Sequence, residues 1–270
     1  MTTTIRPSVL SPESPGPAPG GGVWERVWRH RPSEEKDRAS LEREARCERW
    51  ALIVKALVET FGRIEGLRTI ELGAGRGDLS LLLALRGARV TLLDRTQIAL
   101  DQARERFERF DARAEFLQAD LLDPPDSLTG HSDVSVSLGV IEHFTGADRL
   151  AAVRAHRSVL RPGGLAVISV PNAGCIPYRL WKAYLELRGW WPYGLEIPYS
   201  RRELRRLAEA AGFDRWRLCS TAFLWSLGEQ WSRTFLRWRP GWTDAPSILD
   251  GVMGFNLMLL AWETGRSPED

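Results

Sequence analysis

Cysteine is scarce in this chain of 270 residues, and the few cysteines are scattered. Cys47, Cys175 and Cys219 show no C-x-x-C spacing, which argues against both a disulfide framework and a structural zinc site. Unpaired thiols of this kind are typical of a reducing compartment. We therefore expect a cytoplasmic protein without a metal site.

An excess of charge and long hydrophobic runs are also lacking. The 37 basic and 35 acidic residues leave a formal net charge of +2, and no block of like charge resembles a nucleic-acid-binding tail. No stretch reaches the roughly 18 uncharged apolar residues of a membrane-spanning helix, and the first residues lack the pattern of a secretory signal. We therefore expect a soluble protein with no nucleic-acid partner and no stable membrane insertion. The oligomeric state has no signature in the sequence.

The residues that are present divide the chain into an arm, a helical segment and one large domain. Residues 1–22 are rich in proline and glycine, so we expect a disordered arm. Residues 23–62 become helical in composition and end at Gly62, which predicts a helical cap. Hydrophobic residues make up 43% of the chain, enough for one large core. We place that core in residues 63–264, followed by a flexible tail over 265–270.

Short β-rich runs and helical runs alternate through the large domain. The expected strands are 69–72, 90–94, 114–119, 134–138, 165–170, 215–220 and 255–262, and the expected helices are 79–85, 98–110, 150–160 and 200–211. Such alternation predicts βαβ units, and hence an α/β, Rossmann-like, doubly wound sheet of seven mostly parallel strands. Thr96 is placed to cap the second of these helices.

A glycine-rich segment, Glu71-Leu-Gly73-Ala74-Gly75-Arg-Gly77, lies between the first expected strand and the helix that follows it. Glycines at such a turn let the backbone approach a ligand that a Cβ atom would exclude. The spacing is G-x-G-x-G, whereas a dinucleotide loop has G-x-G-x-x-G and accepts a pyrophosphate. An acidic residue just before the first glycine disfavours phosphates, so the loop suits a cationic ligand better.

This segment resembles the first motif of the class I S-adenosylmethionine-dependent methyltransferases, and the chain is similar to their small-molecule (type 11/23-like) members over about residues 64–212. The resemblance implies S-adenosylmethionine as cofactor. It implies that the carboxylate of Asp94 meets both ribose hydroxyls, and that the side chain of Asp120 meets the adenine amino group. The cofactor-binding residues implied in all are Glu71, Gly73, Ala74, Gly75, Gly77, Asp94, Arg95, Asp120, Leu121, Leu138 and Gly139.

The segment after the fourth expected strand indicates which class of molecule accepts the methyl group. Nucleic-acid amino-methylases of this fold carry an Asn/Asp-Pro-Pro-aromatic motif there, whereas this chain has Glu142-His143. Quinone-biosynthesis O-methyltransferases also carry Glu-His at this point, although Gly139 stands where they often have a further acidic residue. The resemblance implies methyl transfer to a small molecule, and we expect a hydroxyl acceptor, with His143 as a possible general base oriented by Glu142. Glu142 and His143 could instead hold a divalent cation together with Asn172.

An aromatic segment follows the fifth expected strand, where the resemblance implies a substrate lid over about residues 173–199. Its candidate lid residues are Tyr178, Trp181, Tyr184, Trp190, Trp191 and Tyr193. They favour an apolar or aromatic acceptor, but they could equally form a satellite core. A third alternative is peripheral contact with a membrane interface, although the basic residues are too few to favour it. The opposite side of the pocket could be closed by Trp225, Trp231, Phe235 and Trp238.

Two other functions are compatible with the motifs. A nicotinamide-dependent oxidoreductase would share the βαβ start of the domain, although the glycine spacing argues against it. A non-catalytic S-adenosylmethionine-binding protein would retain the glycines and Asp94 without turnover. The expected reaction is an in-line displacement that leaves S-adenosylhomocysteine as product.

Overall fold

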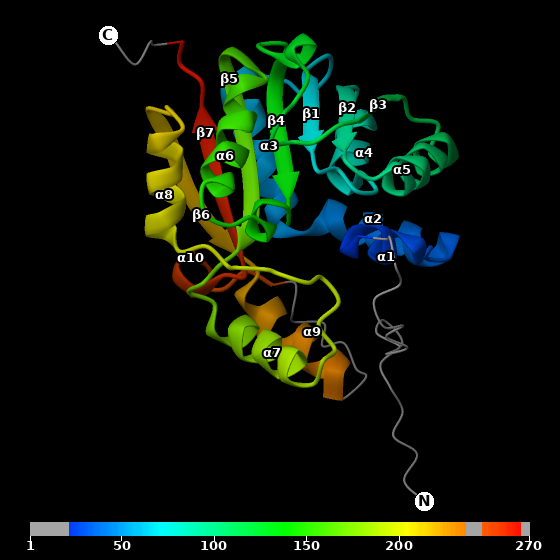
Figure 1. Ribbon diagram of the computed structural model, residues 1–270, viewed down its shortest axis with the longest axis vertical. Helices are drawn as coiled ribbons and strands as arrows, with labels where there is room; N and C mark the ends of the chain where they lie inside the picture. The colour runs from blue at the N-terminus through cyan, green and yellow to red at the C-terminus, as the bar shows by residue number, and fades with distance from the viewer. Residues whose placement is uncertain (1–21, 236–244, 266–270) are drawn as a thin grey trace, which may run out of the picture.

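A seven-stranded sheet forms the centre of the molecule in the computed structural model, which describes residues 22–235 and 245–265 (Figure 1). The arm expected over residues 1–22 lies outside the described residues except for Gly22, and so does the tail over 265–270 except for Gly265. The strands are β1 (Arg68–Leu72), β2 (Arg89–Asp94), β3 (Ala114–Gln118), β4 (Ser132–Leu138), β5 (Leu160–Pro171), β6 (Arg215–Thr221) and β7 (Asn256–Trp262).

The strand order is β3-β2-β1-β4-β5-β7-β6, with every pairing parallel except those of β7. Strands β1 and β4 are buried on both faces over nearly their whole length, as is usual for the central strands of a parallel sheet. The reversal of strand order beside β1 leaves a crevice at the carboxyl ends of the strands, where open α/β sheets bind ligands. The doubly wound, mostly parallel fold is confirmed.

Helices cover both faces of this sheet. Those in the described residues are α1 (Val23–Arg29), α2 (Glu34–Arg46), α3 (Glu48–Phe61), α4 (Asp78–Ala84), α5 (Gln97–Arg109), α6 (Asp148–Ser158), α7 (Ile176–Leu187), α8 (Arg201–Ala210), α9 (Phe223–Phe235) and α10 (Asp250–Met253). One apolar core joins α3, α4 and α5 to the sheet, and the other joins α6 and α8 to the opposite face. None of the described helices has the length and apolar character that crossing a bilayer requires.

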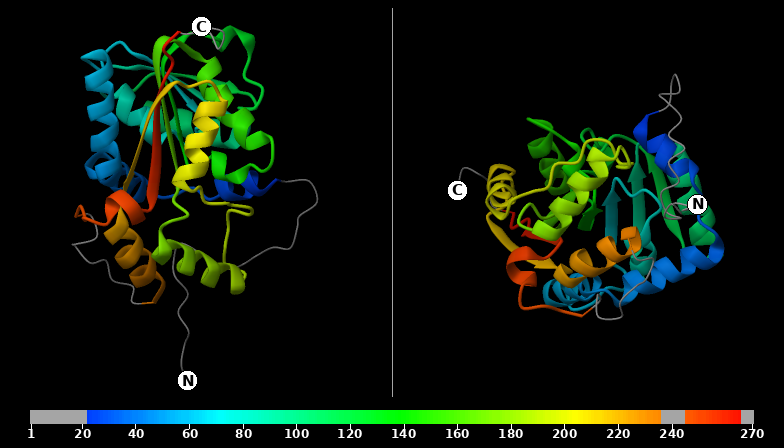
Figure 2. Two further views of the ribbon diagram at one scale, coloured as in Figure 1. Left: turned by 90° about the vertical axis from the view of Figure 1, so that its left-hand side faces the viewer. Right: turned by 90° about the horizontal axis from the view of Figure 1, so that it is seen from below.

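The segment expected to cap the domain, residues 23–62, forms three helices with different positions. The last of them, α3, buries Trp50, Ile53 and Leu57 in the main core and ends at Gly62, whose φ of 72° lies in the left-handed region. In contrast, α1 and α2 lie across the end of the sheet and contact α5 and α4 (Figure 2).

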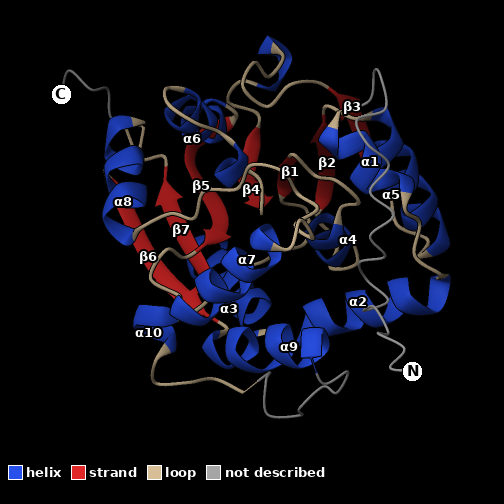
Figure 3. Cartoon of the chain, turned by 60° about the horizontal axis from the view of Figure 1, so that its bottom comes forward, coloured by secondary structure: helices blue, strands red, loops and turns tan. Residues whose placement is uncertain are grey.

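Four helices surround the carboxyl ends of the parallel strands. Helices α7 and α9 pack against each other on one side, and α1 and α2 lie on the other (Figure 3). Elements distant in sequence are thereby placed around one opening.

Candidate active site

A cleft of about 540 Å³ opens at the carboxyl ends of the strands. Its walls come from the loops after β1, β2, β3, β4 and β5, from α1, and from α7, α9 and the loop that follows α7. The volume lies within the range of small-molecule sites, which is about 300–1,000 Å³.

The glycine-rich loop after β1 forms one end of the cleft. The backbone amides of Gly73 and Ala74 both donate to the carbonyl oxygen of Leu93, at 2.8 and 3.0 Å, which ties the loop to β2. Gly75 has a φ of 53°, and a Cβ atom there would lie 2.6 Å from the indole of Trp28. Only glycine fits this conformation and this contact.

Glu71 is buried beneath this loop. Its Oε2 accepts a hydrogen bond from the amide of Ser80 at 3.1 Å, near the start of α4, where backbone amides lack helical partners. Burial raises the pKa of Glu71 to about 7. Glu71 therefore supports the loop and helix as well as lining the cleft.

Asp94, at the end of β2, is held by protein donors on both of its oxygens. Oδ2 accepts from the amide of Gly75 at 2.8 Å, and Oδ1 accepts from the amide and hydroxyl of Thr96 at 2.8 and 2.7 Å. Oδ2 can accept one more hydrogen bond, since a carboxylate oxygen has two lone pairs. Thr96 stands at the N-cap position of α5 but makes no side-chain cap bond, because its hydroxyl is directed to Asp94 instead.

Of the residues expected to bind the cofactor, all but Gly77 line the cleft. Those that line the cleft are Glu71, Gly73, Ala74, Gly75, Asp94, Arg95, Asp120, Leu121, Leu138 and Gly139. Gly77 does not line it. A Cβ atom at Gly77 would collide with the side chains of Leu92 and Phe107, so this glycine allows α4 to pack on the sheet.

His143 lies in a short 3₁₀ turn after β4, formed by Ile141–His143. Its Nδ1 is 2.6 Å from the carbonyl oxygen of Leu195. Because a carbonyl can only accept, the Leu195 contact assigns the proton of the neutral ring to Nδ1 and makes Nε2 the acceptor, and the backbone of Gly139 also interacts with the ring. The edge of Trp24 contacts the imidazole with a centroid distance of 4.7 Å. Burial lowers the pKa of His143, which favours the neutral ring.

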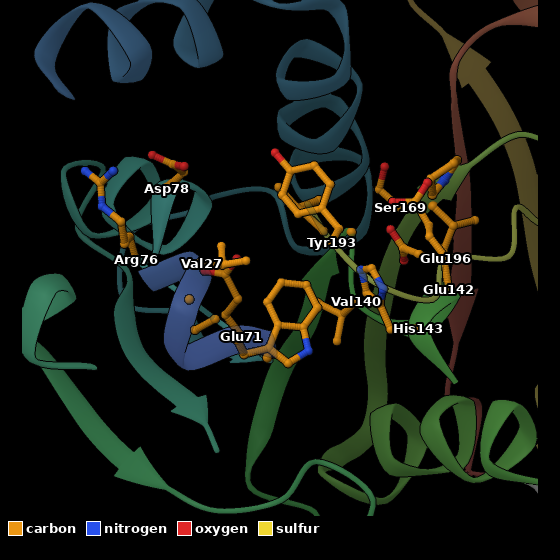
Figure 4. A pocket seen from close by; sticks show the side chains of 18 of the residues that line it. Val27, Glu71, Arg76, Asp78, Val140, Glu142, His143, Ser169, Tyr193 and Glu196 are labelled. Carbon is orange, nitrogen blue, oxygen red and sulfur yellow. The ribbon is translucent and has the colours of Figure 1, made fainter. Parts of the chain in front are cut away.

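Two glutamates lie beside His143 in the cleft (Figure 4). Glu142 is 2% exposed, and its Oε2 has no hydrogen-bond partner among the described residues. Burial holds its pKa well above the usual range, and the nearby carboxylate of Glu196 adds to the effect. Glu196 comes from the loop after α7 and accepts a hydrogen bond from the hydroxyl of Tyr178. One ligand atom from each of Glu142, His143 and Glu196 lies within 4.8 Å of the other two.

Asn172 does not join Glu142 and His143. Its side-chain Nδ2 donates to the carbonyls of Val252 and Gly254 at 3.2 and 2.9 Å, and its Oδ1 accepts from the backbone amide of Gly174 at 2.8 Å. These bonds fix the loop after β5, and the expected cation-binding set with Asn172 is not assembled. Glu196 occupies the third position instead, and no local sequence signal marks it because it is far from Glu142 along the chain.

The aromatic segment is only partly directed to the cleft. Its residues that line the cleft are Tyr178, Trp181, Trp191 and Tyr193. Trp191 packs edge-to-face against Trp181 and Tyr193, with centroid distances of 5.9 and 5.3 Å. Tyr184 and Trp190 pack against each other at 6.2 Å and do not line the cleft.

Helix α9 contributes one aromatic residue to the opposite wall. Trp225 lines the cleft and packs against Phe255 at 4.9 Å. Trp231 donates to the carbonyl of Pro177 at 3.2 Å and lines a separate small hollow between α7 and α9. The side chain of Phe235 and the whole of Trp238 lie outside the described residues.

Helix α1 supplies a wall that the sequence analysis did not single out. Trp24, Val27 and Trp28 line the cleft, and Trp28 covers Gly75. The spacing of four between the two tryptophans places both on one helical face, which is the signal that could have identified them.

The middle of the chain matches a family model. The model described as a methyltransferase domain matches residues 70–164. That range includes the glycine-rich loop, Asp94, Asp120 and His143.

Curated relatives resemble part of the chain. It is 28% identical over 161 residues to a ubiquinone biosynthesis O-methyltransferase of Alkalilimnicola ehrlichii, covering 59% of this chain and 62% of that protein. It is 36% identical over 108 residues to a demethylmenaquinone methyltransferase of Clavibacter sepedonicus, covering 39% of this chain and 41% of that protein. The chain thus spans less than two thirds of the length of either relative.

The fold is shared with solved structures. A crystal structure of magnesium protoporphyrin IX methyltransferase from Synechocystis PCC 6803 with bound SAH aligns with a TM-score of 0.56 and 19% identity. The alignment covers 89% of this chain and 92% of that one. At this identity the likeness establishes the architecture.

Proposed function

We infer that this chain, which carries a class I methyltransferase domain, binds S-adenosylmethionine in the cleft and transfers its methyl group to a small molecule. The observation that carries the inference is the arrangement of the glycine-rich loop against Asp94. The amide of Gly75 orients Oδ2 of Asp94 at 2.8 Å, and this oxygen retains a lone pair for a ligand hydroxyl. Relatives named as small-molecule methyltransferases support the same reading.

The residues present fit this cofactor. The glycine-rich loop lets the backbone approach closely, and Asp94 and Asp120 lie where hydroxyl and amino groups can donate to them. Asp94 and Asp120 bring negative charge to this end of the cleft, which suits a sulfonium cation and disfavours the pyrophosphate of a nicotinamide cofactor. The G-x-G-x-G spacing supports the same choice.

We propose a small apolar or aromatic acceptor with a hydroxyl group. The rings of Trp24, Trp181, Trp191 and Trp225 give the cleft walls suited to such a molecule. The family model stops before α7 and begins after α1, so the acceptor is proposed on the chemistry of this chain's own walls.

His143 would remove the hydroxyl proton. S-adenosylmethionine, when bound, would supply an activated methyl group that the acceptor oxygen attacks in line, with S-adenosylhomocysteine as the leaving group. In this tautomer Nε2 of His143 is the proton-accepting atom, and the carbonyl of Leu195 fixes the ring orientation through Nδ1. Glu196, with a carboxylate oxygen within 4.8 Å, would stabilise the imidazolium formed when the proton arrives. The aromatic walls would exclude water from the reacting groups.

The test is calorimetry followed by turnover. Titration with S-adenosylhomocysteine should give saturable binding, and no comparable binding should occur with NADH. A panel of phenols and other hydroxyl compounds should then release S-adenosylhomocysteine from S-adenosylmethionine. Binding without release for any acceptor would favour a non-catalytic binding protein.

A further inference from the structure

A buried cluster of ion pairs joins helix α2 to the glycine-rich loop. The carboxylate of Asp37, in α2, is 2% exposed and contacts three guanidinium groups. It forms an ion pair with Arg76, lies 3.1 Å from Nε of Arg106, and lies 3.3 Å from Nη1 of Arg109. Arg76 is the residue between Gly75 and Gly77, so this contact reaches the loop itself.

No other described carboxylate makes all three of these contacts. Asp78 pairs with Arg106 at 2.5 Å, but its side chain is 50% exposed. Glu34 reaches Arg109 at 3.9 Å and is 83% exposed. Arg106 is fully buried, and of the two carboxylates that form ion pairs with it in the described residues only Asp37 is buried. A buried charge without its partner is strongly unfavourable, which makes Asp37 the residue on which this cluster depends.

The cluster fixes the loop at more than one atom. Asp37 holds the guanidinium of Arg76, and Nη1 of Arg106 donates to the carbonyl oxygen of Arg76 at 3.3 Å. The neighbouring amide of Gly75 is held by Asp94 at 2.8 Å. A loop ordered before its ligand arrives loses less conformational entropy on binding.

We propose that Asp37 is a positioning residue for the cofactor, acting through Arg76 on the glycine-rich loop. Helix α2 therefore contributes to cofactor affinity although it lies outside the range matched by the family model. This inference rests on the proposed function, because it takes the loop to be the site of S-adenosylmethionine.

The test is calorimetric titration of the full chain with S-adenosylhomocysteine. Asp37→Asn keeps the side-chain shape and removes the charge, and we expect its Kd to rise at least tenfold. Arg76→Gln should raise Kd similarly with a smaller loss of thermal stability, since Arg76 is in a loop and 20% exposed. Glu34→Gln, on the same helix, is the matched control and should leave Kd unchanged.

The double variant Asp37→Asn/Arg76→Gln separates the routes of action. If Asp37 acts through Arg76, the Kd of the double variant should be no higher than that of the more affected single variant. If the increase in Kd of the double variant equals the product of the increases in the two single variants, Asp37 does not act through Arg76. A Kd within twofold of the unaltered protein in both single variants, even with a lower Tm, would show a purely structural role and overturn the proposal. If the unaltered protein does not bind S-adenosylhomocysteine, the proposed function fails and this inference fails with it.

Discussion

Nδ1 of His143 lies 2.6 Å from the carbonyl oxygen of Leu195, which joins the turn after β4 to the loop after α7. The bond selects one tautomer and turns Nε2 into the acceptor. Because Leu195 belongs to the aromatic segment, the position of that segment and the proton-accepting atom of His143 are linked. In its proposed role as base, His143 would need no reorientation before the reaction.

His143→Ala should lower kcat by at least about 100-fold while leaving the Kd of S-adenosylhomocysteine nearly unchanged, because a working base contributes about 10²–10⁴-fold. Burial lowers the pKa of His143, with Lys182 acting in the same direction and Glu142 and Glu196 also facing the ring. The rate should therefore rise with pH through an apparent pKa below the ordinary histidine value. This rise of the rate with pH, the acid limb of the profile, should vanish in His143→Ala.

The exposed His131 provides the control for this experiment. His131→Ala should retain both kcat and the acid limb. If His143→Ala also keeps most of its kcat, orientation alone carries the reaction and His143 is structural. The same assays with EDTA test the alternative that Glu142, His143 and Glu196 hold a cation. Loss of activity that a divalent cation restores would contradict the role of His143 as base.

Asp94→Ala should weaken binding of S-adenosylhomocysteine at least tenfold. Hydrogen bonds to a charged group contribute about 1.5–3 kcal/mol each, and the variant also releases the amide of Gly75. Isothermal titration calorimetry measures the change. Asp101→Ala, on the exposed side of α5, should bind as the unaltered protein does. Equal affinity in Asp94→Ala would remove Asp94 from the site.

Gly75→Ala should also weaken cofactor binding, because the new Cβ would lie 2.6 Å from Trp28 and φ is 53°. Gly130→Ala has a similar backbone strain, with φ at 69°, but nothing within 4 Å of the new Cβ, so it controls for strain alone. Adding Trp28→Ala to Gly75→Ala should recover part of the affinity if the collision is the cause. If affinity is not recovered, the loss of cofactor binding comes from backbone strain at Gly75 and not from the collision with Trp28.

Trp191→Ala should raise the acceptor KM several-fold with little change in the KM for S-adenosylmethionine, because Trp191 lines the cleft next to Trp181 and Tyr193. Trp190→Ala, one residue earlier and outside the cleft lining, is the matched control. Steady-state kinetics with each substrate varied would separate the two effects. Equal losses for both substrates would indicate general destabilisation instead of a role in acceptor binding.

His156 should make the protein less stable in acid. It is fully buried between the hydroxyls of Ser135 and Ser137, at 3.1 and 3.0 Å, and burial lowers its pKa from 6.5 to about 3. The unfolded chain therefore binds more protons between these values, and stability falls as pH drops below 6.5. The loss is about 1.4 kcal/mol per pH unit, or about 2 kcal/mol at pH 5.

Chemical denaturation at pH 7 and pH 5 measures this loss. Glu71 acts in the opposite sense, because its pKa is raised to about 7 and its contribution improves as pH falls through that value. The comparison is therefore made between the unaltered protein and His156→Gln, which should lose less stability between the two pH values. Identical pH dependence in the two proteins would contradict the assignment.

Local signals in the sequence predicted much of the fold. Alternating apolar runs gave the strand positions, and Ser200 accepts from the amide of Glu203 at 3.1 Å, as the capping pattern indicates. The glycine-rich loop and Asp94 were found because their spacing relative to strand ends is short and regular. The same local reasoning assigned the Thr96 hydroxyl to a helix cap, where the structure directs it to Asp94.

Long-range contacts lay beyond reach of such signals. Glu196 reaches Glu142 and His143 across more than fifty positions, and Asp37 reaches Arg76 across 39. Trp24 meets His143 from a helix near the other end of the domain. Side chains brought together by tertiary packing leave no spacing rule in the sequence, so these partners required the structure.

The position of Trp24, Trp191 and Trp225 outside residues 70–164 has a consequence for how this protein can diversify. The strand-end loops that hold the proposed donor site form one uninterrupted stretch of chain, whereas the acceptor walls come from the segments before and after it. Substitutions in those flanking segments can alter the proposed acceptor walls without changing the residues of the proposed donor site. The match of the family model to residues 70–164 therefore bears on the proposed methyl-donor site, and two proteins that share this middle segment need not share an acceptor.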